Sequence, residues 1–96
     1  MPLKVEVRPR TYHDSIVLML ASQHMLQAER VEAAMAAMAT PLNLDLLRDA
    51  GLWAPELEDA GANDLVLAAR GEGAEAAISL GRAALAEVAS PAPTWP

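Results

Sequence analysis

The sequence predicts a small α+β domain, and three local patterns support this prediction. Apolar and charged residues alternate over residues 3–8, the period of two that a strand with one buried face shows, and Pro9 ends the run. A short continuous apolar run indicates a buried strand over residues 64–70. Three further segments carry helical periodicity or helix-capping residues. The length of 96 residues fits one domain.

The first predicted helix begins at Tyr12 or His13 and runs to about Ala28. Thr11, followed three residues later by Asp14, resembles a capping box, in which the threonine hydroxyl accepts from a first-turn amide. Apolar residues cover more than one narrow stripe of this helix. We therefore expect it to pack on the domain on one side and on a partner on another.

The segment 31–39 supports two interpretations. Its alanines and methionines favour a helix. A helix running unbroken from residue 12 to residue 39 would, however, lack caps for its length. Propensity alone indicates helix, and the residues leave the choice open.

A short helix is predicted over residues 41–50. Thr40 is a good N-cap, Pro41 fits the first helical position, and Gly51 stands where a helix-ending glycine belongs. We expect Trp53 to fold back onto this helix as the largest apolar side chain of the core. The expected buried face of the helix consists of Leu42, Leu46 and Leu47.

The last helix is predicted over residues 73–89, after a turn that contains Gly71 and Gly73. The run G-x-G-x-x-A at this turn matches a dinucleotide-binding fingerprint, but two glutamates in the loop would repel a pyrophosphate. We interpret it as an ordinary turn. Residues 90–96 hold three prolines and cannot continue the helix. We therefore assign residues 1–89 to a single domain and residues 90–96 to a Pro-rich tail or linker.

Composition excludes several classes of function. A net charge of −6 is unfavourable for binding the negatively charged phosphate backbone of a nucleic acid, so we expect no nucleic-acid partner. The chain has no cysteine, hence no disulfide and no thiolate metal site. The longest apolar runs, residues 33–39 and 16–21, are far shorter than the roughly 20 residues of a bilayer span. The sequence thus predicts a soluble, cytoplasmic domain without a membrane partner.

The polar residues do not converge on a catalytic or metal site. His13 and His24 are eleven residues apart, about 16 Å along a helix, and neither has a ligand partner three or four residues away. Neighbours such as Asp14 and Ser15 point about 100° apart on a helix and cannot relay a proton. The acidic residues at 56–59 fit a solvated loop. We therefore predict no catalytic residue, no metal and no cofactor.

The core is expected to be thin. Twenty-one of the apolar residues are alanines, and aromatic residues make up 3% of the chain. A domain of this size buries only roughly 60 to 65 per cent of its unfolded surface, so its stability is marginal unless a partner covers an apolar face. We expect a homo-oligomer or binding to a larger subunit.

A set of short motifs spans residues 4–88: Asp14-Ser15, Leu18-Met19, Met38, Thr40-Pro41-x-Asn43, Leu46-Leu47, Gly51-x-Trp53, Asn63-Asp64 and Ala68-x-Arg70. Together they resemble the N-terminal domain of the FdrA family, which is acyl-CoA synthetase-like. In that family the domain precedes a longer region similar to the succinyl-CoA synthetase alpha subunit, and the family is linked to oxamate carbamoyltransferase. Ala39 departs from the pattern, which has glycine there.

The resemblance implies that residues 31–38 form a strand. The resulting order is that of a ferredoxin-like split β-α-β unit, a three-stranded sheet with helices that lacks the last strand. A parallel β-α-β-α-β-α arrangement is the alternative.

The resemblance also implies a function: a non-catalytic N-terminal module or small subunit of an FdrA-like acyl-CoA synthetase or carbamoyltransferase complex, acting in assembly and binding a larger FdrA-like subunit. The alternative is a regulatory domain that senses a small molecule. Candidate ligand or partner contacts are Thr40, Asn43, Trp53, Asn63 and Arg70. We expect no turnover by the isolated chain, because it lacks a phosphate cradle or phosphoryl carrier.

Overall fold

Three strands and three α-helices make up the computed structural model, which describes residues 2–89. The Pro-rich segment assigned to residues 90–96 lies outside the described residues. In chain order the elements are β1 (Leu3–Arg8), α1 (Ser15–Leu26), β2 (Val31–Met38), α2 (Pro41–Asp49), the 3-10 helix η1 (Pro55–Asp59), β3 (Leu65–Gly71) and α3 (Ala74–Ala89). None of the helices in this described part is long and apolar enough to cross a membrane.

The sheet has the strand order β1-β3-β2, and β3 is antiparallel to both of its neighbours. β1 and β2 therefore run in the same direction with β3 between them, which is the split β-α-β unit of a ferredoxin-like fold without a fourth strand. The predicted α+β class is confirmed, and the parallel alternative is wrong. The segment that the residues left open is a strand over residues 31–38, because antiparallel pairing with β3 outweighs the helix propensity of its alanines.

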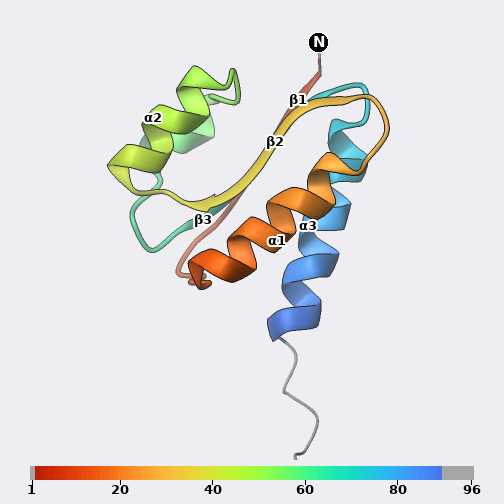
Figure 1. Cartoon of the computed structure of the whole chain (residues 1–96). Helices are drawn as coiled ribbons and strands as arrows, with labels where there is room; N and C mark the ends of the chain where they lie inside the picture. The colour runs from red at the N-terminus through yellow and green to blue at the C-terminus, as the bar shows by residue number, and fades with distance from the viewer. Residues whose placement is uncertain (1, 90–96) are drawn as a thin grey trace, which may run out of the picture.

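Helices cover both faces of the sheet (Figure 1). α1 and α3 pack on one face and on each other, and they bury the alternate residues Leu65, Leu67 and Ala69 of β3 in a first core. α2 and η1 lie on the other face, where Val66 and Ala68 join a second core with Leu47, Leu52 and Leu57. The two residue sets alternate along β3, so a single central strand supplies both cores.

The beginning of α1 differs from the prediction. The helix begins at Ser15, and the carboxylate of Asp14 accepts from the Ile16 amide at 3.2 Å, so Asp14 is the N-cap. The Thr11 hydroxyl instead donates to the Pro9 carbonyl at 3.1 Å. The predicted Thr11 capping box is therefore wrong, because the chain between β1 and α1 is tied to a distant turn by the hydrogen bond from the Thr11 amide to the Asn63 carbonyl.

The short helix α2 begins as predicted, but its buried face differs. Thr40 is the N-cap, Pro41 is in the first turn and Gly51 follows the C-cap with a φ of +75°. Leu47 is fully buried, whereas Leu42 and Leu46 are exposed. Leucines occur on all sides of this nine-residue helix, so the pattern did not define which side meets the sheet.

Trp53 is not the centre of the core. It is half-buried against the second core, and the guanidinium of Arg48 lies 4.2 Å from the centroid of its ring. The largest fully buried side chains on this face are instead Leu47, Leu52 and Leu57. The expectation that Trp53 is the main apolar body of the core is therefore wrong.

Candidate functional site

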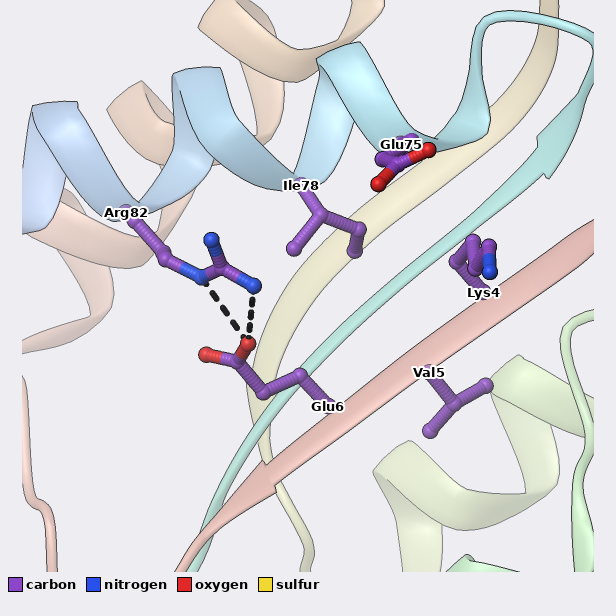
Figure 2. A pocket seen from close by; sticks show the side chains of 6 residues that line it. All are labelled: Lys4, Val5, Glu6, Glu75, Ile78 and Arg82. Atoms are coloured by element: carbon purple, nitrogen blue, oxygen red, sulfur yellow. Dashed lines mark hydrogen bonds and ion pairs between the residues drawn. The ribbon is translucent and has the colours of Figure 1, made fainter.

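The strand β1 forms an open edge of the sheet with two chemically different faces. Leu3, Val5 and Val7 pack half-buried against the second core. Lys4 and Glu6 lie on the opposite face, which α3 overhangs (Figure 2). This follows from the alternating sequence, because successive side chains of a strand point to opposite faces.

Glu6 on β1 binds two arginines, Arg82 of α3 and Arg8 of β1 itself. Its Oε1 accepts from Arg82 Nε at 2.8 Å and from Arg82 Nη2 at 2.5 Å, while its Oε2 accepts from Arg8 Nε at 2.7 Å (Figure 2 shows the Arg82 pair). The hydrogen bond from Arg82 lowers the pKa of the Glu6 carboxyl below its usual 4.5, although partial burial opposes this shift. Glu6 therefore stays ionised at neutral pH.

A shallow cavity of about 170 Å³ lies beside this ion pair, between β1 and α3. Its lining combines two carboxylates and two cations with apolar surface, from Lys4, Val5, Glu6, Glu75, Ile78 and Arg82 (Figure 2). Sites for cofactors and drug-sized ligands usually enclose about 300 Å³ or more. The cavity thus fits one long side chain better than it fits a cofactor.

The ion pair between Glu6 and Arg82 gives an expected pH dependence of stability. A carboxyl whose pKa is lowered by folding stabilises the folded state above its unfolded pKa, and that stabilisation is lost as the pH falls through the lowered folded pKa. We expect Glu6→Gln to lower the melting temperature at pH 7 by a few degrees. In melts recorded from pH 7 to pH 2, the difference from the parent should close only below about pH 4.5. A difference that does not depend on pH would contradict this role of the carboxylate.

Two of the predicted contact residues lie together at the N-terminus of α2. The Thr40 hydroxyl accepts from the Asn43 amide at 3.3 Å, and Asn43 Nδ2 donates to the Met38 carbonyl at 2.8 Å. Thr40 therefore caps α2, and Asn43 holds the end of β2. Both side chains have structural partners.

Arg70 and Trp53 lie near the other end of α2. A Cβ built on Gly51 would come within 3.1 Å of Arg70 Nη1, so the guanidinium packs directly against this glycine. The buried Arg70 Nε has no hydrogen-bond partner among residues 2–89. Trp53 follows Gly51 by two residues and stacks with Arg48. Two arginines and one ring therefore meet around the C-terminus of α2, where cations are favoured by the helix dipole.

Asn63 is in the turn before β3. It is exposed, and its carbonyl accepts from the Thr11 amide at 3.1 Å. Its neighbour Asp64 accepts from the Gly61 amide at 2.9 Å and the Arg10 amide at 3.1 Å, bonds that lower the pKa of the Asp64 carboxyl. The motif Asn63-Asp64 thus marks the turn correctly, but the side chain that holds the turn is that of Asp64, which is not among the five predicted contacts.

The five predicted contacts do not form one site. Ala39, next to Thr40, donates to the Asp64 carbonyl at 2.9 Å, so Thr40, Asn43 and Asn63 lie near the start of β3. Arg70 is near the end of that strand, with Trp53 close to it. At about 3.3 Å per residue the two groups are about 20 Å apart.

Backbone atoms of residues 29–32 occupy the space beside the glycines of the turn before α3. The Gly73 amide donates to the Arg30 carbonyl at 3.1 Å. A Cβ on Gly71 or Gly73 would overlap the carbonyl oxygen of Arg30 or Glu29, respectively. These glycines admit the backbone of the turn between α1 and β2, which explains the motif without a bound nucleotide.

The donor residues do not assemble into a metal site. Within residues 2–89, no group of three or more His, Cys, Asp or Glu side chains is close enough to hold one ion. The whole sequence lacks cysteine, the soft ligand of thiolate sites. His24 is on α1, and His13 precedes that helix.

Comparison with known proteins places the chain in a family. The model of the family described as "AllF, heavy metal-associated domain" matches residues 1–94. The chain belongs to this family. A curated relative of this AllF-family domain is the uncharacterized protein YahF of Escherichia coli strain K12, which is 40% identical over 72 residues. The match covers 75% of the chain and only 14% of YahF. No solved structure gives a significant match.

The AllF-family domain also exposes an apolar stripe on α1. Helical spacing places Ile16, Met19 and Leu20 on the side of α1 opposite the buried residues Leu18 and Met25. Ile16 is 65% exposed, Met19 60% and Leu20 44%. We call these three residues the outer stripe of α1. The expectation from the sequence that α1 is apolar on two sides is confirmed.

Proposed function

We propose that this AllF-family domain is a non-catalytic docking module of a larger FdrA-like acyl-CoA synthetase or carbamoyltransferase complex and acts in its assembly. The observation that carries the proposal is the outer stripe of α1, three large apolar side chains that remain in contact with water on the isolated domain. Contiguous exposed apolar surface of this kind is typical of an interaction site.

Two findings support a larger protein as the partner. The matched segment accounts for 14% of YahF, so in that relative the domain is a small part of a long chain. The set of motifs from Asp14-Ser15 to Ala68-x-Arg70 resembles the N-terminal domain of the FdrA family, in which a region similar to the succinyl-CoA synthetase alpha subunit follows. That region is the partner we propose for the outer stripe.

The sensor alternative has less support. Thr40 and Asn43 are hydrogen-bonded within the domain, and Asn63 lies at the other end of β3 from Arg70. A ligand of ordinary size could not contact both groups.

A heavy-metal function does not fit the residues of this chain. Although the family description contains the words "heavy metal-associated", no group of three donor side chains meets within residues 2–89, and the sequence has no thiol. We expect one equivalent of Zn²⁺ or Cd²⁺ to leave the melting temperature of the chain unchanged within about 1 °C, since a ligand that does not bind the folded state cannot stabilise it. A saturable rise in melting temperature at micromolar metal would contradict this expectation.

The docking proposal is tested with a double variant in the outer stripe. The chain is mixed with the purified succinyl-CoA synthetase alpha-like region of an FdrA-like protein from the same genome, and binding is measured by titration calorimetry. We expect Ile16→Asp with Met19→Asp to weaken binding at least tenfold, because apolar anchors at the centre of an interface contribute most of its affinity. Ser79→Asp, at an exposed and already polar position on α3 rather than on the outer stripe, is the matched control and should bind like the parent. Equal binding of all variants, or no complex with the parent, would refute the proposal.

Enzyme activity gives an independent test. We expect the purified chain to show no turnover in acyl-CoA synthesis or carbamoyl transfer, because the cavities within residues 2–89, the one beside Glu6 and a larger one beside Arg30 and Glu72 among them, are open surface hollows with carboxylates in their lining and no phosphate cradle. Turnover above the buffer rate that increases with the concentration of the chain would contradict a non-catalytic role.

A further inference from the structure

The two edges of the sheet differ in how their backbone groups are satisfied. In an antiparallel pair, one residue bonds to the partner strand and the next directs its N–H and C=O outward. On β2, the Ala39 amide bonds to the Asp64 carbonyl, so the outward residues include Ala36 and Met38. The hydroxyl of Ser22 on α1 accepts from the Ala36 amide at 2.9 Å, and Asn43 on α2 donates to the Met38 carbonyl at 2.8 Å. Side chains from both helices thus occupy the C-terminal half of the β2 edge, and a register shift between Val31 and Ala33 interrupts its N-terminal half.

The β1 edge is open, because the outward backbone groups of this strand have no hydrogen-bond partner within residues 2–89. The Gly71 amide donates to the Pro2 carbonyl at 2.9 Å, which makes the even-numbered residues of β1 the ones that bond to β3. Leu3, Val5 and Val7 therefore direct three N–H and three C=O groups away from the sheet. No residue in the range 2–89 bonds to these outward groups.

We propose that this edge pairs with the same edge of a second copy of the chain, as an antiparallel β1–β1 seam centred on Val5. The register follows from charge together with the length of the strand: centring on Val7 would also place opposite charges together, Glu6 and Arg8, but it would leave Val5 opposite Pro9, which lies beyond the end of β1 and has no N–H. Centring the two-fold axis on Val5 places Lys4 of each copy opposite Glu6 of the other, on the face that α3 overhangs. Centring it on Glu6 or on Lys4 would instead place that residue opposite its own copy, with like charges in direct contact.

The other face of the seam is also self-complementary. In the register centred on Val5, the two Val5 side chains meet, and Leu3 of each copy faces Val7 of the other. All three side chains are half-buried in one copy, so a neighbouring strand would remove further apolar surface from water. The seam therefore joins apolar side chains on one face and opposite charges on the other.

The cavity between β1 and α3 can accommodate the side chain of Lys4 from the second copy. Lys4 of the second copy would extend over Ile78 toward the carboxylates of Glu6 and Glu75, which line the 170 Å³ cavity. Its methylene groups would cover apolar surface while its ammonium group meets negative charge. This surface is separate from the outer stripe of α1, so the inference does not depend on the proposed function.

Amide hydrogen exchange of the 96-residue chain, followed by NMR at 20 µM and at 1 mM, tests the seam directly. We expect the Leu3, Val5 and Val7 amides to become protected at the higher concentration, while the Lys4, Glu6 and Arg8 amides are protected at both. Sedimentation equilibrium should show a dimer over the same range, and its affinity should be weak because a single strand pair is a small interface.

Charge variants test the register. We expect Lys4→Gln to weaken the dimer about threefold and Lys4→Glu about tenfold, because each dimer contains two Lys4–Glu6 pairs. Glu32→Gln on β2, the other edge strand, is the control and should dimerise like the parent. Far-UV circular dichroism confirms that each variant is folded.

Four outcomes would overturn the proposal. The first is a monomer at 1 mM, and the second is a dimer in which the Leu3, Val5 and Val7 amides still exchange, which would indicate another surface such as the outer stripe. The third is protection of these amides at every concentration, which would mean that a segment of the same chain fills the edge. The fourth is a dimer that Lys4→Glu leaves unchanged.

Discussion

Gly71→Ala is expected to destabilise the domain by about 3 kcal/mol or more. Gly71 has a φ of +125°, a conformation that costs side-chain-bearing residues of order 1–3 kcal/mol. A Cβ there would also overlap the Arg30 carbonyl oxygen and come within 3.0 Å of the Glu32 amide nitrogen. These are backbone atoms of the turn into β2 and cannot rotate away, so the turn would have to move. The measurement is urea unfolding followed by far-UV circular dichroism.

Gly61→Ala provides the control for Gly71→Ala. Its nearest contact would be Asp64 Oδ2 at 3.9 Å, an ordinary van der Waals distance, so we expect a change within about 0.5 kcal/mol. The pair also separates two interpretations of the glycine-rich turn. If the glycines served a dinucleotide, Gly71→Ala would remain as stable as Gly61→Ala and lose only ligand binding. Equal stability of the two variants would therefore contradict the structural role.

Elements with strong local signals could be predicted from the sequence. β1 was predicted at its observed bounds because alternation with a period of two, ended by Pro9, is typical of a strand with one buried face. The start of α2 was predicted because Thr40 and Pro41 satisfy the N-terminus by themselves. β2 required the family resemblance, because its alanines carry no strand preference and its strand state comes from pairing with β3.

The features of the candidate site depend on contacts between distant residues. Arg82 reaches Glu6 across 76 positions of sequence, and Ser22 reaches Ala36 across 14. Helical spacing cannot indicate either contact. The five predicted contact residues came from motifs, and two of them, Thr40 and Asn43, are engaged in holding α2 and β2 in place. The sequence could indicate the open edge only indirectly, through Lys4 and Glu6 on one face of β1.

Leu47→Ala is expected to destabilise the domain by about 2–5 kcal/mol, the usual cost of removing a buried leucine side chain. Leu47 is fully buried in the second core, between α2 and the sheet. The loss is large for a domain whose total stability is of order 5–15 kcal/mol. Leu42→Ala is the matched control in the same helix: Leu42 is 69% exposed, so the change should stay within about 0.5 kcal/mol.

Trp53→Ala is expected to destabilise the domain less than Leu47→Ala and more than Leu42→Ala. Trp53 is half-buried, so its truncation removes less apolar contact than that of a buried tryptophan, together with a cation–π contact to Arg48 that contributes about 0.5–1 kcal/mol. All three variants are made in a Trp95→Phe background, and their free energies of unfolding are measured by urea unfolding. Unfolding of Trp53→Ala is followed by circular dichroism. If Trp53→Ala were the most destabilising of the three variants, the tryptophan would be the centre of the second core, as its size alone suggests. That result would contradict a second core built around the buried side chains of Leu47, Leu52 and Leu57.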